Sequence, residues 1–205
     1  MLEFPSNIAI VILAAGASKR MGSPKQLLKW GDETLINYSI KTVQKVNTKS
    51  VVVVLGANFE LIKNGIQTSE VTILNNPHWE KGLGTSIAVA VEYLQNSKSS
   101  VDGVLITLCD QPLITSDFLK LLISKFQLDK NQIIATSYGN GKHGVPALFD
   151  KVYFNELMGL SDDQGAREIL KRQSNNVIGV TPPESNVDLD TKEDYTTLYQ
   201  SKFKK

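Results

Sequence analysis

Short apolar stretches rich in β-branched residues recur along this chain. They lie at 8–13, 51–55, 71–74, 104–108, 133–136 and 177–180. Several of them are apolar without interruption, whereas a strand with one solvated face alternates apolar and polar positions. The pattern therefore predicts strands that are buried on both faces of a sheet.

Helical periodicity fills most of the intervals between these stretches. Apolar side chains recur at helical spacing over 35–43, 87–94 and 118–126. This alternation of strands and helices predicts an α/β fold with three layers, α/β/α, around a mostly parallel, Rossmann-like sheet with right-handed crossovers. Because ligands of such folds bind beyond the carboxyl ends of the strands, the candidate chemistry should lie there.

The length and composition fit one domain, over 1–205, that has no general attraction for polyanions. The 205 residues are 41% hydrophobic, and 22 basic against 21 acidic residues give a net charge of +1, which favours neither nucleic acid nor an anionic membrane as a partner. The first apolar stretch is short and no basic segment precedes it, so we interpret it as a buried strand. The single cysteine, Cys109, excludes an internal disulfide and a multi-thiolate metal site, and suits a cytoplasmic protein.

The segment after the first predicted strand combines small residues with cations. It reads LAAGASKRMGSPK over 13–25. Small residues let the backbone approach a ligand closely, and Ser18, Arg20 and Lys25 can donate to phosphate oxygens. The segment matches neither the P-loop pattern GxxxxGK[ST] nor the dinucleotide pattern GxGxxG. It predicts an anion-binding loop of another kind, the alternative being an ordinary turn with solvated cations.

An acidic residue follows the stretch at 104–108. Asp110 stands just before Gln111 and Pro112, where the strand should end in solvent. Mg²⁺ prefers one or two protein carboxylates together with water and substrate phosphates, so Asp110 is a candidate metal ligand. Alternatively, Asp110 only caps the turn. We expect Cys109 to be a small buried residue and not a nucleophile, because an apolar strand raises the pKa of a thiol.

Another candidate site precedes the helical pattern at 87–94. Gly84, Thr85 and Ser86 stand where the helix should begin, and free amides at a helix N-terminus suit an anion or a nucleotide. Simple helix capping is the alternative. The two histidines, His78 and His143, have no carboxylates at metal-ligand spacing, so we do not expect a zinc site.

The segment LAAGASKRMGSPKQLL closely resembles the signature LAAGxSxRMGxxKLL of the molybdenum cofactor cytidylyltransferases. The resemblance implies that this loop wraps a nucleoside triphosphate, with Arg20 and Lys25 neutralising it, and that CDQP contains the metal ligand Asp110. Guanylyltransferases of the wider group tend to carry glycine where Ala15 stands. The nucleotide-binding residues so implied are Leu13, Ala14, Ala15, Gly16, Ser18, Arg20, Lys25, Gly84, Thr85, Ser86 and Asp110.

Further segments resemble the same family in the same order, over 8–195. DDQGAR at 162–167 is similar to GDxGAR, with Asp162 in the glycine position. NVDLDTKED at 186–194 is similar to DxDTPED, in which an acid completes the metal site, so Asp188 and Asp190 both stay candidates. The same segment implies that Thr191 begins the last helix. The acceptor-binding residues implied by the resemblance are Gln111, Pro112, His143, Pro146, Asp163 and Arg167.

The resemblance implies a nucleotidyltransferase fold (GT-A-like) with a nucleotide-binding part at about 1–110 and an acceptor-binding part at about 111–205. It implies Mg²⁺-dependent transfer of CMP from CTP to molybdopterin, with catalytic roles for Arg20, Lys25 and Asp110. A recipient molybdoenzyme or its chaperone is the protein partner to expect. The alternatives are a GTP-dependent guanylyltransferase, a sugar- or alcohol-phosphate nucleotidyltransferase, and a non-catalytic module that binds nucleotide or cofactor.

Overall fold

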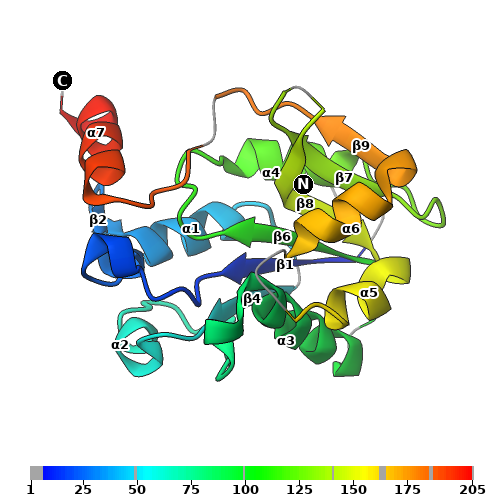
Figure 1. Ribbon diagram of the computed structural model, residues 1–205, viewed down its shortest axis with the longest axis horizontal. Coiled ribbons are helices and arrows are strands. Elements are labelled where there is room, and N and C mark those ends of the chain that lie inside the picture. The colour runs from blue at the N-terminus through cyan, green and yellow to red at the C-terminus, as the bar shows by residue number, and fades with distance from the viewer. Residues whose placement is uncertain are drawn as a thin grey trace.

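A seven-stranded sheet forms the centre of the protein in the computed structural model (Figure 1). The structure describes residues 7–48, 50–98, 100–139, 141–161, 165–184 and 187–204. The strand order is β5-β4-β1-β6-β8-β7-β9, and within this sheet only β8 runs antiparallel to its neighbours. The strands are β1 (Ile8–Leu13), β4 (Ser50–Leu55), β5 (Thr72–Asn75), β6 (Gly103–Leu108), β7 (Ile133–Ser137), β8 (His143–Asp150) and β9 (Val177–Val180).

Every strand predicted from the apolar stretches is present, with bounds that differ by at most one residue. The pattern did not predict β8, because Gly144 and Pro146 lower the strand propensity of its first half. The pairing of β8 with β7 shifts register between Ala135 and Thr136. This irregularity accommodates Pro146, which has no N–H to donate to a neighbouring strand.

Helices cover both faces of the sheet, as predicted. On one face α1 (Leu35–Gln44) and α4 (Ser116–Ser124) pack against Ile10 and Ile12 of β1; on the other, α3 (Leu83–Asn96), α5 (Phe154–Met158) and α6 (Ala166–Arg172) pack against Ala9 and Val11. Burial of each larger apolar side chain stabilises the fold by about 1.5–3 kcal/mol. The remaining elements are α2 (Phe59–Asn64), α7 (Lys192–Phe203), β2 (Lys29–Trp30), β3 (Glu33–Thr34), η1 (Lys19–Met21), η2 (Lys25–Leu27), η3 (Trp79–Lys81), η4 (Lys151–Tyr153) and η5 (Ser174–Asn176).

No helix in the described part of the chain combines the length and the apolar character that crossing a bilayer requires.

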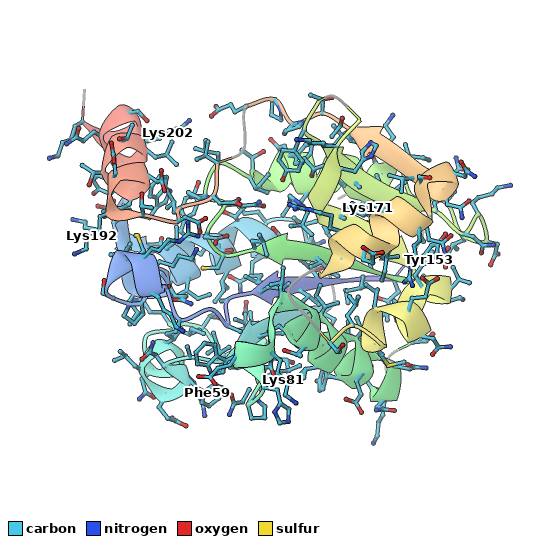
Figure 2. All side chains as sticks on the ribbon, in the orientation of Figure 1. Phe59, Lys81, Tyr153, Lys171, Lys192 and Lys202 are labelled. Carbon is cyan, nitrogen blue, oxygen red and sulfur yellow. The ribbon has the colours of Figure 1, made fainter. Side chains whose placement is uncertain are left out.

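The C-terminal helix α7 packs on the β2–β3 hairpin through aromatic side chains. The ring centroid of Trp30 lies 5.2 Å from that of Phe203 and 6.0 Å from that of Tyr199, in edge-to-face arrangements. The Tyr195 hydroxyl donates to the carbonyl of Lys29 at 2.7 Å. Helix α7 stands at one side of the molecule, beside β2 and the loop after β1 (Figures 1 and 2). Its position brings the preceding residues 187–191 to the carboxyl ends of β1 and β6.

Helix α7 begins with a capping box at Thr191, where the resemblance placed the start of the last helix. The Thr191 hydroxyl accepts from the Asp194 N–H at 3.2 Å, and the Asp194 carboxylate accepts from the Thr191 N–H at 2.8 Å. These two bonds satisfy amides that the first helical turn leaves without helical partners.

Thr191→Ala should lower the local stability of α7 by about 1 kcal/mol, because the variant loses the hydroxyl that caps the helix. Native-state hydrogen exchange of the α7 amides measures this change. Thr196→Ala is the matched control. Its hydroxyl donates only to the Lys192 carbonyl within the same helix, so its loss should leave exchange unchanged or slightly slower. Equal protection in Thr191→Ala and the wild type would contradict the capping role.

Candidate functional site

The candidate site lies at the carboxyl ends of β1 and β6, which are neighbours in the sheet. Leu13 pairs with Leu108 at the last positions of these strands, and the Cys109 N–H donates to the Leu13 carbonyl at 3.1 Å. The loop after β1 and the turn that contains Asp110 therefore leave the sheet side by side. Parallel pairing of two buried strands thus places the two strongest sequence motifs together, where α/β folds bind ligands.

The loop after β1 turns its carbonyl groups away from open space. The Gln26 side-chain amide donates to the carbonyls of Ala14 at 2.8 Å and Gly16 at 2.9 Å, and the Ala57 N–H donates to the Ala15 carbonyl at 2.9 Å. Among the described residues, the N–H groups of Ala15, Gly16 and Ala17 have no hydrogen-bond acceptor. Gly16 borders open space. Consecutive free amides around a gap form a concavity that suits an anion.

The Ser18 hydroxyl holds this loop together. Ser18 adopts a left-handed conformation with φ of 55°, and its Oγ accepts from the Lys25 N–H at 3.1 Å. The same hydroxyl lies 3.4 Å from Gln26 Oε1, to which it donates. The sequence suggested Ser18 as a phosphate ligand, whereas in this structure its hydroxyl fixes the start of η2 and thus the backbone of Lys25.

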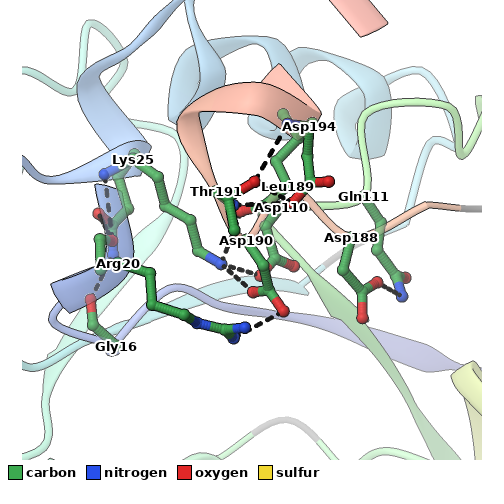
Figure 3. A network of polar contacts seen from close by, with 12 residues as sticks. Gly16, Arg20, Lys25, Asp110, Gln111, Asp188, Leu189, Asp190, Thr191 and Asp194 are labelled. Atoms are coloured by element: carbon green, nitrogen blue, oxygen red, sulfur yellow. Dashed lines mark hydrogen bonds and ion pairs between the residues drawn. The ribbon is translucent and has the colours of Figure 1, made fainter. Parts of the chain in front are cut away.

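The Lys25 ammonium lies among three oxygens from two distant segments (Figure 3). It forms an ion pair with Asp110 Oδ2, lies 3.3 Å from Asp190 Oδ1 and donates to the Leu189 carbonyl at 3.0 Å. Burial alone would lower the pKa of Lys25, but the Asp110 and Asp190 carboxylates outweigh it and raise that pKa. Arg20 binds the other oxygen of Asp190 at 2.8 Å. Both candidate cations are therefore charged and held by carboxylates.

Asp110 has one carboxylate oxygen that is buried and has no hydrogen-bond partner in the described structure. This oxygen is Oδ1, since Oδ2 binds Lys25. Burial raises the pKa of Asp110 and the Lys25 ammonium lowers it, while the charges of Asp188 and Asp190 raise it, and the net shift is upward. An unpartnered acceptor in this surplus of negative charge fits a divalent cation, which prefers carboxylate oxygens.

The two C-terminal candidates for the metal site point to different partners. Asp190 approaches Lys25 and Arg20, whereas Asp188 accepts from the Gln111 side-chain amide at 2.8 Å (Figure 3). The Leu189 N–H donates to the Asp110 carbonyl at 3.0 Å, which fixes this segment against the end of β6. Within the described residues, no three His, Cys, Asp or Glu side chains are already gathered as a metal cage. Two carboxylates, of Asp110 and Asp190, share one cation.

The hydroxyls at the start of α3 bind a buried asparagine. The helix begins at Leu83, and the side-chain amide of Asn76 donates at 2.9 Å to both Thr85 Oγ1 and Ser86 Oγ. Asn76 Oδ1 accepts from the His78 N–H at 2.9 Å. Neither hydroxyl caps the helix, so the suggestion that one of them does so is wrong. Gly84 lies in the first turn of the helix.

The described residues expected to bind the acceptor lie in three places, namely the turn after β6, strand β8 and helix α6. Gln111 and Pro112 adjoin Asp110. His143 and Pro146 belong to β8, where the His143 ring lies so close to Gly179 of β9 that a Cβ on that glycine would approach its Nε2 to 2.6 Å.

The Pro146 carbonyl accepts from the buried Thr136 hydroxyl at 2.7 Å. Arg167 is exposed in the first turn of α6 and has no ion-pair partner in the described part of the chain. Asp162 and Asp163 lie outside the described residues.

Sequence reasoning missed two buried amides that shape the site. Gln26 is 1% exposed and Asn76 is fully buried. Each follows a motif that the sequence did identify, Gln26 directly after Lys25 and Asn76 directly after a strand. Neither stands in an apolar segment, since Gln26 follows Lys25 and Asn76 follows Asn75, so the local sequence did not indicate their burial. Their partners are backbone and hydroxyl groups that only the folded chain brings near.

A family model and one relative each match most of this chain. The family model described as MobA-like NTP transferase domain matches residues 10–177. The chain is 28% identical over 192 residues to the molybdenum cofactor cytidylyltransferase of Escherichia coli (strain K12), covering 94% of this chain and 95% of that protein.

Two solved structures share the three-layer fold, which confirms the predicted fold class. The Mycobacterium tuberculosis Rv0371c homolog from Mycobacterium sp. strain JC1 has a TM-score of 0.81 and 26% identity, covering 95% of this chain and 96% of that chain. Rv0371c from Mycobacterium tuberculosis H37Rv in complex with manganese has a TM-score of 0.77 and 24% identity, covering 96% and 100% of the two chains.

Lys25→Met should lower the free energy of unfolding by about 3 kcal/mol, because it leaves the partly buried Asp110 and Asp190 carboxylates without their shared cation. Urea denaturation at neutral pH in the presence of a chelator measures the loss. Arg20→Met is the control: the side chains of Arg20 and Asp190 are 68% and 40% exposed, so its cost should stay below about 1 kcal/mol. Equal effects of the two substitutions would show that burial does not distinguish these ion pairs.

Proposed function

Because this chain belongs to the MobA-like NTP transferase family, we propose that it transfers CMP from CTP to the phosphate of molybdopterin and releases pyrophosphate. Membership of the family makes the chain a nucleotidyltransferase, and the proposal adds the base and the acceptor. One observation carries it: the Lys25 ammonium lies between Asp110 and Asp190, beside a loop with three N–H groups that have no acceptor among the described residues. Cations, carboxylates and free amides are what a metal-bound triphosphate requires.

The triphosphate would bind in the loop after β1. The free N–H groups of Ala15, Gly16 and Ala17 would receive phosphate oxygens, and Arg20 and Lys25 would supply positive charge. Both cations are at present bound to carboxylates, so they would exchange these partners for phosphates. The exchange requires that another cation satisfies the carboxylates.

The acidic residues fit that second cation. Asp110 Oδ1 is buried without a partner, and Asp190 shares Lys25 with it, which favours Asp190 over Asp188 as the second ligand. Asp188 is held by Gln111 and is the alternative. When bound, Mg²⁺ would neutralise the phosphates and polarise the reacting phosphorus. The manganese complex of Rv0371c supports a divalent cation in this fold.

Transfer needs no covalent enzyme intermediate. An oxygen of the acceptor phosphate would attack the α-phosphorus of CTP, forming one P–O bond while the bond to the β-phosphate breaks and pyrophosphate leaves. The attacking phosphate is ionised at neutral pH, so the chain's residues position two polyanions and neutralise the leaving group. Cys109 does not compete as a nucleophile, because burial raises the pKa of its thiol.

Two features support the cytosine base and the molybdopterin acceptor. The loop carries Ala15 where guanylyltransferases tend to carry glycine, and the Escherichia coli relative is a molybdenum cofactor cytidylyltransferase. Gln111 and Pro112 adjoin Asp110, so an acceptor that contacts them would reach the α-phosphorus.

Pyrophosphate release with CTP, GTP, ATP and UTP, each with Mg²⁺ and molybdenum-loaded molybdopterin, tests the proposal. We expect CTP to react faster than the others by at least about tenfold in kcat/KM. Faster release with another base would overturn the base assignment alone. Release that requires a sugar phosphate or an alcohol phosphate in place of molybdopterin would overturn the acceptor assignment, and binding without any release would indicate a non-catalytic module.

Substitution of each acid in turn tests the metal site. Asp110→Asn should lower kcat about a thousandfold, because the metal loses its buried ligand. Asp190→Asn should lower kcat roughly a hundredfold and raise the Mg²⁺ concentration needed for half-maximal rate, whereas Asp188→Asn should leave that concentration within about threefold of the wild type. The reverse order for Asp190 and Asp188 would assign the second ligand to Asp188.

A further inference from the structure

The side chain of Gln26 lies inside the loop that is expected to bind phosphate. Gln26 is 1% exposed, and its amide touches three points of this loop. It donates to the carbonyls of Ala14 at 2.8 Å and Gly16 at 2.9 Å, and it accepts from the Ser18 hydroxyl at 3.4 Å. One side chain therefore bridges the first, third and fifth residues after β1.

These partners determine which way the Gln26 amide points. Two carbonyl oxygens can only accept, so they must face the NH₂ group, and the oxygen of the amide then faces the Ser18 hydroxyl. A side chain in this place needs two donors on one atom together with the length of glutamine. Methionine has the length and no donor, glutamate has at most one donor, and asparagine is shorter by one methylene.

The consequence is a loop whose first three carbonyl groups are all bonded within the protein. Gln26 holds the carbonyls of Ala14 and Gly16 inward, and the Ala57 N–H holds the carbonyl of Ala15. A peptide group turns its carbonyl and its N–H to opposite sides. The N–H groups of Ala15 and Ala17 therefore point away from Gln26, and Gly16 between them borders open space. Without these bonds, a buried carbonyl would have to turn toward water to be satisfied. Its outward oxygen would then repel a phosphate.

Gln26 also connects the loop to the cation beside it. Gln26 directly follows Lys25 in η2, and the Ser18 hydroxyl that contacts the Gln26 amide also accepts from the Lys25 N–H. The Gln26 amide and the Ser18 hydroxyl thus fix the backbone of Lys25 relative to the loop that carries the three free N–H groups.

We propose that Gln26 is a positioning residue that turns the amides of Ala15 and Ala17 toward the triphosphate without touching it. The inference rests on the proposed function only in taking this loop as the phosphate site. It requires neither a cytosine base nor a molybdopterin acceptor.

Inorganic tripolyphosphate with Mg²⁺ is the direct probe, because it lacks a base and needs no acceptor. Isothermal titration of the full chain should show that Gln26→Met weakens tripolyphosphate and CTP to a similar degree, by about tenfold in Kd, the equivalent of about 1.4 kcal/mol. In turnover, KM for the nucleotide should rise by a similar factor with a smaller change in kcat. An unchanged Kd in a folded Gln26→Met variant would overturn the proposal.

Asn37→Leu is the matched control for loss of a buried amide. Asn37 is 3% exposed and donates to Thr34 Oγ1 at 2.7 Å and to the Gly65 carbonyl at 2.8 Å, so it ties α1 to another loop. Asn37→Leu should reduce the free energy of unfolding and leave the tripolyphosphate Kd as in the wild type. Equal weakening of tripolyphosphate by Asn37→Leu and Gln26→Met would reduce Gln26 to a general structural role and overturn the proposal.

Gln26→Glu provides the second test if Gln26→Met does not fold. An ionised glutamate would face two carbonyl oxygens, whereas a protonated one keeps the shape and one donor. We therefore expect a change in the ratio of two Kd values for tripolyphosphate, that of Gln26→Glu over that of the wild type at the same pH. This ratio should decrease as the pH is lowered from 8 to 6. A constant ratio would overturn the proposal.

The proposed function fails separately: a wild-type chain that binds tripolyphosphate but transfers no CMP leaves the comparison of variants valid. A wild-type chain that binds neither tripolyphosphate nor CTP overturns both.

Discussion

The ion pairs of the Lys25 ammonium hold the site together. They join the loop after β1, the end of β6 and the segment before α7, which lie far apart in the sequence. Outside bulk water such a cluster is favourable only while every charge keeps a partner. The positions of Asp110 and Asp190 therefore depend on Lys25, and the aromatic contacts of α7 with Trp30 keep the last segment within reach.

The charged side chains of the site suit a ligand that carries both positive and negative charge. A metal-bound triphosphate offers a cation to the carboxylates and an anion to Lys25 and Arg20, so each broken ion pair has a replacement. Neither the metal nor the triphosphate alone satisfies both sets. Coupled binding of the two follows from the requirement that a partly buried charge stays paired.

Hydrogen bonds between uncharged groups also shape the site. Gln26 and Asn76 are buried amides whose donors and acceptors all meet loop or helix-start groups around the site. In contrast, Asp110 Oδ1 and Gln111 Oε1 are buried oxygens of adjacent residues with no partner in the described structure. Unsatisfied acceptors are costly in a folded protein, and a ligand that offers a cation or a donor would satisfy them.

Apolar periodicity determined the parallel strands and the helices α1, α3 and α4, because burial leaves a pattern along the chain itself. Motif order likewise identified Arg20, Lys25, Asp110 and the pair Asp188 and Asp190. The pattern did not predict strand β8, because Gly144 and Pro146 lower its strand propensity. Pairing with β6 and β7 stabilises this strand in the folded chain. The divergence of Asp188 from Asp190, and the roles of Gln26 and Asn76, were decided by tertiary structure. These depend on which polar groups meet in the folded chain, and residue types along the sequence do not specify which hydrogen-bond partners meet.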